Sequence, residues 1–204
     1  GLSRRLLDSN LSLMRSLGNA IAKRDSDTDA HNYRVTYYAV ALAEAMGMPN
    51  KEVADLIVGA FLHDVGKIGI PDSILLKPGR LTPEEFEIMK THAHLGIEIV
   101  EDNPWLKGAA LTIRHHHERF DGTGYPERLG GTAIPLNARI FAVVDVFDAL
   151  TSERPYKEPM SLSDALIIIR KDSGWHLDPD VVDAFHVIGP DSYAQTVLAS
   201  ENEL

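Results

Sequence analysis

The sequence of 204 residues contains no cysteine. Disulfide bonds and thiolate metal sites are therefore excluded, so any metal ion here has to be held by histidine and carboxylate side chains. The lack of cysteine also fits a reducing compartment, and we expect a cytoplasmic protein. Nine histidines are a modest excess for such a chain.

Positive charge is scarce, because 20 lysines and arginines face 30 aspartates and glutamates, a formal net charge of -10. A field of that sign opposes nonspecific binding of DNA or RNA. It still permits a small anionic substrate, because local cations can invert the charge of a pocket. No apolar run approaches the roughly 20 residues of a membrane span, and no signal peptide is visible. The chain begins at Gly1 without methionine, so we expect a fragment that lacks upstream domains.

Strand-type alternation and internal repeats are lacking too, whereas apolar residues recur at three- and four-residue steps. We therefore expect an all-α fold, a helical bundle of about eight helices with a Gly-rich loop between two of them. The helices are expected over residues 2–24, 28–46, 51–65, 82–101, 104–117, 137–150, 161–173 and 178–189.

Two carboxylates stand in apolar helical segments. Asp64 follows His63 directly after the apolar residues 54–62, and Asp145 lies within the apolar run 142–147. A buried carboxylate costs several kcal/mol unless it is paired or bound to a cation. The only local partner of Asp64 is Lys67. Bound cations explain two such carboxylates beside several histidines more easily than chance does.

Further histidines, namely His31, His92, His116 and His117, fall on or at the ends of the expected helices. Helix bundles hold metal ions with inward-facing side chains, and imidazole with carboxylate suits Fe, Mn, Zn or Ni. Adjacent helical residues point about 100° apart. A His-His or His-Asp pair is therefore predicted to serve two ions side by side, or to bridge them through the carboxylate, rather than to chelate one. A histidine taken alone is more often a surface or hydrogen-bonded residue, and no single pair is diagnostic.

Taken in order, these motifs resemble the HD-GYP family, a branch of the HD superfamily of metal-dependent phosphohydrolases. The resemblance covers roughly residues 28–185 with family-like spacing, and many ordered motifs are far more specific than one short pattern. The matching stretches are His31-x-x-Arg34, His63-Asp64-x-Gly66-Lys67-Ile68, Pro71, His92-x-x-x-Gly96, His116-His117-Glu118, Asp121-Gly122-Thr123-Gly124-Tyr125-Pro126, Ile134-Pro135, Asp145-Val146-Phe147-Asp148-Ala149-Leu150-Thr151 and Arg154-Pro155-Tyr156-Lys157.

On this basis we divide the chain into an N-terminal helix over residues 1–27, an HD-GYP catalytic domain over residues 28–190 and a C-terminal tail over residues 191–204. The resemblance implies hydrolysis of cyclic di-GMP to pGpG and on to GMP, by attack of a metal-bridging hydroxide on phosphorus. It also implies two or three divalent metal ions, iron or alternatively manganese. The implied metal ligands are His31, His63, Asp64, His92, His116, His117 and Asp145, with Asp64 as the bridge. Asp27 stands where trinuclear members carry glutamate, which makes it the candidate ligand of a third ion.

Substrate contacts follow from the same resemblance. Asp64 and Lys67 are the expected catalytic residues, and Lys67, Arg154 and Lys157 are expected to bind the phosphates. The alternative for Arg154 and Lys157 is a solvated basic turn. Tyr125 and Pro126, in the Gly-rich loop, either close a tight turn or shape the substrate cleft or a docking site for a diguanylate cyclase. A homodimer is a further expectation.

Supporting roles fall to residues near the expected ligands. Arg34 is interpreted as orienting a carboxylate or packing locally rather than touching substrate. Asp148, on the same helix face as Asp145, is interpreted as supporting a ligand. The remaining histidines are interpreted as surface or supporting groups: His94, His115, His176 and His186.

Three other functions remain open. The first is hydrolysis of another cyclic nucleotide, such as cyclic GMP-AMP. The second is a non-catalytic module that senses the dinucleotide or docks a cyclase. The third is di-iron oxygen chemistry, against which the expected phosphate-binding cations argue.

Overall fold

The computed structural model describes residues 12, 14, 16–21, 23, 24, 29–152 and 158–189. This part of the chain forms nine α-helices and three short 3-10 helices and contains no β-strand, which confirms the all-α prediction. The helices are α2 Asp29–Ala45, α3 Asn50–Leu62, η1 Val65–Gly69, α4 Asp72–Leu75, α5 Pro83–Lys90, α6 His92–Val100, η2 Pro104–Leu106, α7 Ala110–His115, η3 Gly131–Ala133, α8 Leu136–Thr151, α9 Leu162–Asp172 and α10 Pro179–Ile188. Residues 12, 14 and 16–21 are helical as well, and we call them the N-terminal helical segment.

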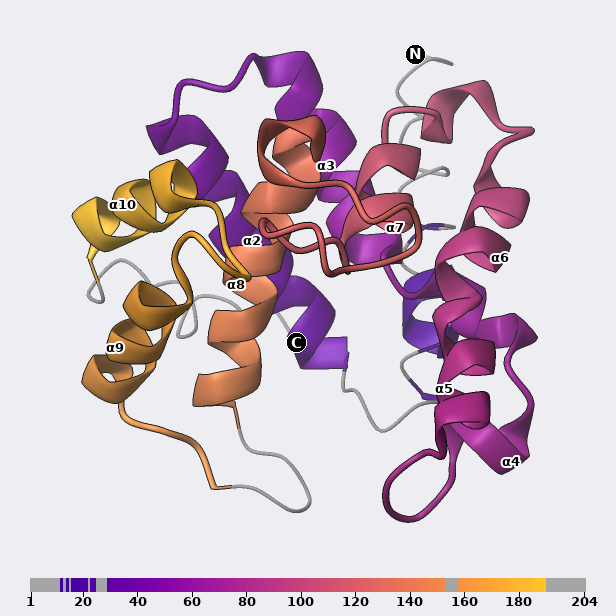
Figure 1. The fold of residues 1–204 in the computed structure, drawn as a ribbon. Helices are drawn as coiled ribbons and strands as arrows, with labels where there is room; N and C mark the ends of the chain where they lie inside the picture. Colours follow the sequence, from indigo (N-terminus) through magenta and orange to yellow (C-terminus); the bar gives the residue numbers. More distant parts are fainter. Residues whose placement is uncertain are drawn as a thin grey trace.

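Helix α8 runs through the middle of the molecule, with α9 and α10 on one side and α4 to α7 on the other (Figure 1). It is not an amphipathic surface helix, because buried residues lie on all of its sides, among them Phe141 and Phe147. The main apolar core joins α8 to α2, α3, α9 and α10. Such a central helix presents its few polar side chains to the interior, where they need partners.

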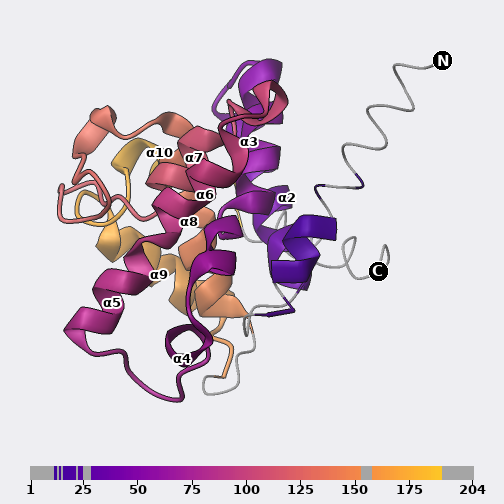
Figure 2. The same cartoon turned by 90° about the vertical axis from the view of Figure 1, so that its right-hand side faces the viewer.

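A second, smaller apolar cluster lies beside the first. It joins Met14 and Ile21 of the N-terminal helical segment to Phe61, Leu62 and other residues of α3, η1, α6 and α7. The turn of 90° in Figure 2 shows α5 and α4 at the lower end of the molecule and α3 at the upper end. In this cluster the N-terminal helical segment, α6 and α7 all pack against the carboxyl end of α3. This packing fixes the position of the residues that follow α3.

Three expected helices are shorter than the apolar spacing indicated. The helix expected over 51–65 ends at Leu62, and that expected over 104–117 is divided into η2 and α7. The helix expected over 82–101 is divided into α5 and α6 at Thr91. Its amide (3.0 Å) and its hydroxyl (2.7 Å) both bond to Ile88 O, which tightens this turn.

Close packing of η1 on α6 explains the first of these differences. A Cβ atom on Gly66 would lie 1.8 Å from His92 O and 2.4 Å from Gly96 N, so only glycine fits. This contact places the start of α6 against the turn that follows Asp64. Residues nearly 30 positions apart are thereby brought into one site.

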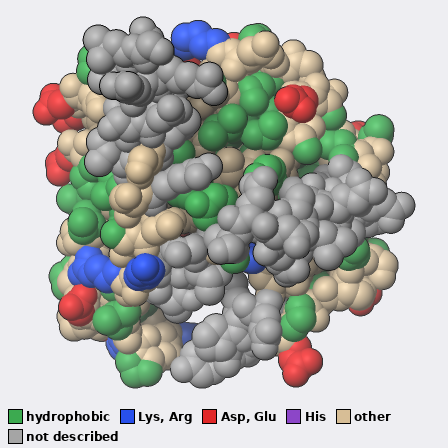
Figure 3. All heavy atoms as spheres, turned by 180° about the vertical axis from the view of Figure 1, so that it is seen from behind, with side chains coloured by type: hydrophobic (Ala, Val, Ile, Leu, Met, Phe, Trp, Pro, Cys, Tyr) green, Lys and Arg blue, Asp and Glu red, His purple; other side chains and the backbone are tan. Residues whose placement is uncertain are grey.

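The face of the molecule that lies behind the view of Figure 1 is distinguished by the types of its side chains. Hydrophobic side chains gather near its middle, and no histidine is visible among the described residues on that face (Figure 3). Within the described residues, none of the helices combines the length and the apolar character that crossing a lipid bilayer requires.

Candidate metal centre

The His63-Asp64 pair lies at the junction of α3 and η1. Asp64 has φ of -99° and ψ of 10°, outside the α-helical region. The expectation that the two side chains diverge as helical neighbours is therefore wrong. Instead, His63 Nε2 lies 3.0 Å from Asp64 Oδ2, so both side chains point to the same place.

Four side chains converge next to this pair. Asp64, His92, His116 and His117 each offer a ligand atom, and these atoms all lie within 4.8 Å of one another. Asp64 Oδ1 lies 3.5 Å from His92 Nε2 and 3.9 Å from His116 Nε2. His92 opens α6, while His116 and His117 follow the last residue of α7. One carboxylate and three imidazoles at this spacing can hold a divalent cation.

The imidazoles are oriented by the backbone. His63 Nδ1 bonds to Ala60 O at 2.8 Å, and His92 Nδ1 bonds to Met89 O at 2.7 Å. His116 Nδ1 bonds in the same way to Ile113 O at 3.0 Å. Since a carbonyl oxygen only accepts, each Nδ1 is the protonated nitrogen, and Nε2 is turned toward Asp64. Metal-bound histidines have this arrangement, so the residues fit a metal ion.

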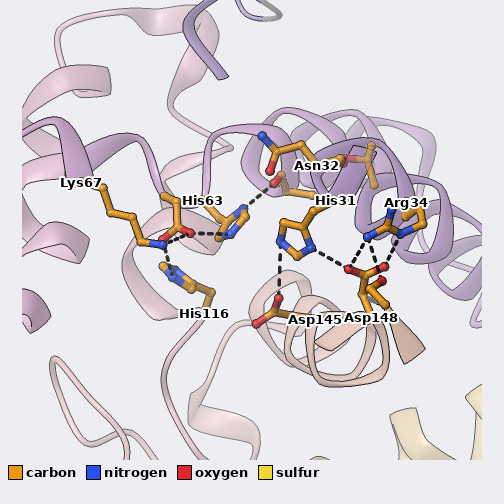
Figure 4. A network of polar contacts seen from close by, with 12 residues as sticks. His31, Asn32, Arg34, His63, Lys67, His116, Asp145 and Asp148 are labelled. Atoms are coloured by element: carbon orange, nitrogen blue, oxygen red, sulfur yellow. Dashed lines mark hydrogen bonds and ion pairs between the residues drawn. The ribbon is translucent and has the colours of Figure 1, made fainter. Parts of the chain in front are cut away.

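A second group of side chains joins α2 to α8 (Figure 4). His31 Nδ1 donates to Asp148 Oδ2 at 2.7 Å, while His31 Nε2 faces Asp145 Oδ1 at 3.7 Å. Arg34 donates to both oxygens of Asp148, at 2.6 and 3.0 Å. Arg34 thus contacts a carboxylate, and Asp148 holds His31, an expected ligand.

Asp148 is buried and ionised. Burial by itself would raise its pKa, but the hydrogen bonds from His31 and Arg34 outweigh burial and lower the pKa to about 2. The carboxylate is therefore ionised at neutral pH, where it accepts a hydrogen bond from the His31 ring and orients it. A histidine backed by a carboxylate is a common feature of metal sites.

His63 links the two groups. Its ring centroid lies 5.6 Å from that of His31 and 5.3 Å from that of His116. The two oxygens of Asp64 face different neighbours, Oδ1 toward His92 and Oδ2 toward His63. The seven expected ligands within the described residues therefore lie in one continuous site, and Asp64 lies where its groups meet. Asp27 falls outside the described residues.

The charges of the cluster suit a cation. Burial, followed by the neighbouring His92, lowers the pKa of His117 to about 3, and burial also holds the pKa of His116 well below its ordinary value. For His63, burial is outweighed by Asp64, which raises its pKa to about 9. Asp64 resists the effect of its own burial because Lys67 and His63 hold its pKa well below the ordinary value. Without a metal ion, the site is thus neutralised by a protonated His63 and by Lys67.

Lys67 contacts the carboxylate directly. Its Nζ lies 2.7 Å from Asp64 Oδ2, one turn along η1. Lys67, which was expected to bind phosphate, therefore forms a salt bridge with its local partner Asp64 in this structure. The two other expected phosphate-binding residues, Arg154 and Lys157, lie outside the described residues.

The Gly-rich loop lies against the cluster. Tyr125 stacks on His117 with ring centroids 4.7 Å apart. A Cβ atom on Gly124 would lie 2.4 Å from Arg119 N, so the chain can approach this closely only at glycine. Tyr125 thus packs on a candidate ligand, and Pro126 follows it through a cis peptide bond.

Glu118 is the functional residue for which the sequence analysis named no role. It is 2% exposed. Its two oxygens accept the backbone amides of Glu127 at 2.8 Å and Leu129 at 3.1 Å, on the far arm of the loop. An acidic residue directly before a glycine-rich loop, where backbone amides lack partners, is the signal that could have indicated this role.

The remaining histidines stand apart from the four-residue cluster. His94 is exposed on the surface, as interpreted. His115 is buried, with its Nδ1 3.8 Å from Glu118 Oε1, so it supports the residue that holds the loop.

Comparison with known proteins relates the chain to the HD domain family. A family model described as "HD domain" matches residues 15–181. The "Cyclic di-GMP phosphodiesterase response regulator RpfG" of Xanthomonas campestris pv. campestris (strain 8004) is 48% identical over 170 residues, 82% of this chain and 45% of that protein. The "3'3'-cGAMP-specific phosphodiesterase 2" of Vibrio cholerae serotype O1 (strain ATCC 39315 / El Tor Inaba N16961) is 41% identical over 181 residues, 87% of this chain and 34% of that protein.

A solved structure shares the fold. The cyclic GMP-AMP specific phosphodiesterase V-cGAP3 of V. cholerae superimposes with a TM-score of 0.71 at 21% sequence identity, over 93% of this chain and 52% of that one. The chain spans less than half the length of the curated relatives RpfG and phosphodiesterase 2. The matched family model and the ordered motifs around His63-Asp64 and Gly124-Tyr125-Pro126 show that the chain belongs to the HD domain family, in its HD-GYP branch.

Proposed function

We propose that the chain is a metal-dependent phosphodiesterase that hydrolyses cyclic di-GMP. The observation that carries the proposal is the convergence of Asp64, His92, His116 and His117 within 4.8 Å. The 48% identity to a protein named a cyclic di-GMP phosphodiesterase, over 82% of this chain, supports the substrate. The HD domain match over residues 15–181 supports the hydrolase class.

We assign the metal ions to two adjoining groups of ligands. His92, His116 and His117 would hold one ion, while His31, His63 and Asp145 would hold the other, with one oxygen of Asp64 for each. A histidine that binds a metal ion usually has its other ring nitrogen hydrogen-bonded. Four of these imidazoles already have such a bond, because their Nδ1 atoms donate to Ala60 O, Met89 O, Ile113 O or Asp148. Iron is the proposed metal and manganese the alternative, since His with carboxylate suits both. Divalent ions bound here would supply a water of lowered pKa and would polarise the phosphate.

The protein side chains would position the phosphodiester. Lys67 Nζ lies 2.7 Å from Asp64 Oδ2, at the edge of the ligand cluster. When Asp64 binds metal ions, Lys67 would bind a phosphate oxygen and stabilise the charge that develops on it. Arg154 and Lys157 are proposed as further phosphate-binding residues on the basis of sequence alone.

Tyr125 and Pro126 are proposed to line the same cleft. The Tyr125 ring lies on His117 and, at 6.4 Å between centroids, beside His92. Its position next to two candidate ligands favours a contact with substrate over a purely structural role. Docking of a diguanylate cyclase at this loop, a homodimer, the domain boundaries after residues 27 and 190 and the cytoplasmic location stay predictions.

The expected product is the linear dinucleotide pGpG, with GMP as the product of a second cut. A second candidate substrate is cyclic GMP-AMP, because the 41% identical V. cholerae protein is named for it. Both substrates present the same phosphodiester to the metal centre and differ in one base. The site geometry is common to them, so turnover has to decide between them.

Hydrolysis tested on one preparation can decide the proposal. The protein is purified anaerobically, its iron and manganese are quantified, and it is incubated with cyclic di-GMP and, separately, cyclic GMP-AMP. Chromatography follows pGpG, GMP and the mixed linear product over time. Asp64→Ala and His63→Ala should abolish turnover, while His94→Ala should not, because His94 is exposed and lies outside the cluster. Metal-loaded protein that leaves both dinucleotides intact would rule out the proposed activity in favour of a sensing or docking module.

A further inference from the structure

Arg24 forms hydrogen bonds with the segment that follows the His63-Asp64 pair. Its Nη1 donates to Lys67 O at 3.0 Å and to Ile68 O at 2.6 Å. Its Nη2 donates to Ile70 O at 2.8 Å and to Asp72 Oδ1 at 2.7 Å. One guanidinium thus reaches four oxygens on a stretch of six residues, from a position more than 40 residues earlier in the chain.

The contacts have a clear physical basis. The last carbonyls of a helix have no partner within it, and η1 ends at Gly69. A cation at the carboxyl end of a helix is also favoured by the helix dipole. Arginine suits this role better than lysine, because its planar fork reaches several acceptors in a fixed geometry. Arg24 therefore caps η1 from another part of the chain.

The N-terminal helical segment packs on the chain just before the His63-Asp64 pair. A Cβ atom on Gly18 would lie 2.7 Å from Phe61 Cε1 and 3.2 Å from Phe61 O, so the segment lies directly on the last turn of α3. Met14 and Ile21 pack into the same apolar cluster as Phe61. The segment thus packs on the chain two residues before His63, and Arg24, which follows the segment, contacts the chain three residues after Asp64.

We propose that Arg24 is a positioning residue for the metal centre. By capping η1 it fixes the backbone of Lys67, and through η1 it fixes the carboxylate of Asp64, which lies in a non-helical conformation directly before η1. Without Arg24, the carbonyls of Lys67, Ile68 and Ile70 lose their shared donor and η1 can change its turn geometry. Asp64 and Lys67 then shift relative to His63 and His92. The catalytic part of this inference rests on the proposed hydrolysis, whereas its effect on metal binding does not.

Variants at Arg24 test the inference in the full chain. Arg24→Ala should weaken Co²⁺ affinity and lower kcat by at least about ten-fold, because several hydrogen bonds to a charged group are lost. It should also change the visible spectrum of bound Co²⁺. Arg24→Lys, which supplies one point donor, should lie between Arg24→Ala and the original protein. Guanidinium at millimolar concentration should restore part of the Co²⁺ affinity of Arg24→Ala.

Two controls separate positioning from general stability. Lys23→Ala alters an exposed neighbour and should leave metal affinity and kcat unchanged. Asp72→Asn removes the negative charge of the exposed ion pair with Arg24 and should have an effect of less than about three-fold. The melting temperature is measured for every variant, since a merely structural role would lower it without changing the Co²⁺ spectrum of the folded protein.

The outcomes are distinct. A folded Arg24→Ala variant with the original Co²⁺ affinity and spectrum overturns the inference, whatever its activity. If Arg24→Ala does not fold, Arg24→Lys decides in the same way. If the unaltered protein hydrolyses neither dinucleotide, the proposed function fails, while Co²⁺ affinity and spectrum still test Arg24.

Discussion

The phenol ring of Tyr125 stacks on the imidazole of His117, with centroids 4.7 Å apart and an interplanar angle of 30°. His117 belongs to the four-residue cluster that can hold a metal ion. The Gly-rich loop and the candidate metal centre are therefore in direct contact. Aromatic pairs of this kind contribute about 0.5–1.5 kcal/mol beyond the area that they bury.

Replacement of Tyr125 tests this contact. Tyr125→Phe keeps the ring and should retain kcat/KM within about three-fold, whereas Tyr125→Ala should lower it about ten-fold, as expected for loss of one stacked ring. Steady-state kinetics with cyclic di-GMP measures both variants. Equal losses in the two variants would show that the hydroxyl, and not the stacked ring, is what matters.

Glu118→Gln should loosen the loop. One of the two accepted backbone amides would face an NH₂ group instead of an oxygen, and loss of a hydrogen bond to a charged group costs about 1.5–3 kcal/mol. Urea unfolding should show that loss, and kcat/KM should fall because Tyr125 is carried by the same loop. Glu127→Gln is the matched control. Its side chain is 40% exposed in a surface pair with Arg114, so it should change stability by less than about 0.5 kcal/mol.

Asp148→Asn should destabilise the metal-free protein in a pH-dependent way. The pKa of Asp148 is lowered to about 2 in the folded protein, so its ionised form stabilises the fold above its unfolded pKa of 3.8. This stabilisation is about 2 kcal/mol at neutral pH and is lost as the pH falls toward 2. Urea unfolding in EDTA should show a difference from the original protein that is larger at pH 7 than at pH 3.

The control for that experiment is Asp183→Asn. Asp183 pairs with Arg170 on the surface, where its side chain is 68% exposed, so its replacement should have little effect at either pH. A pH-independent loss in Asp148→Asn would indicate that Asp148 is not ionised in the folded protein.

Metal binding should release a proton from His63. The pKa of His63 is raised to about 9 in the metal-free protein, so its imidazole is protonated at pH 7, whereas a metal ligand is neutral. About one proton is therefore released per bound cation at this site, and affinity rises with pH up to about 9. His116 and His117 contribute none, because their pKa values are already low. Calorimetry in two buffers of different ionisation enthalpy counts the protons, and His63→Gln should abolish the release.

Asp27→Glu tests the number of metal ions. Asp27 stands at the family position of a third-site ligand, and glutamate has one more methylene with which to reach a metal. If a third site depends on this length, Asp27→Glu should raise the metal content from two ions toward three per chain, as measured by elemental analysis. An unchanged metal content would argue against a third site at this position.

Much of the site could be predicted from the sequence, because the ligands stand in recognisable local patterns. Ordered motifs predicted the HD domain. The prediction that Asp64 and Asp145 are buried was only partly correct, because 18% and 31% of their side chains are exposed. The expected helices were also mostly correct, since three- and four-residue apolar spacing is a local property. Where helices end was less predictable, because the break at Thr91 depends on a shared bond to Ile88.

Only the tertiary structure decided how these residues meet. The position of His92 beside Asp64 follows from the close packing at Gly66, and the pairing of His31 with Asp148 follows from α2 crossing α8. The sequence by itself determined which residues carry metal-binding chemistry and on which helices they lie, because composition and spacing are written along the chain. The roles of Glu118 and Arg24 depend on hydrogen bonds to backbone amides and carbonyls elsewhere in the chain, and only the folded chain shows which side chain makes them.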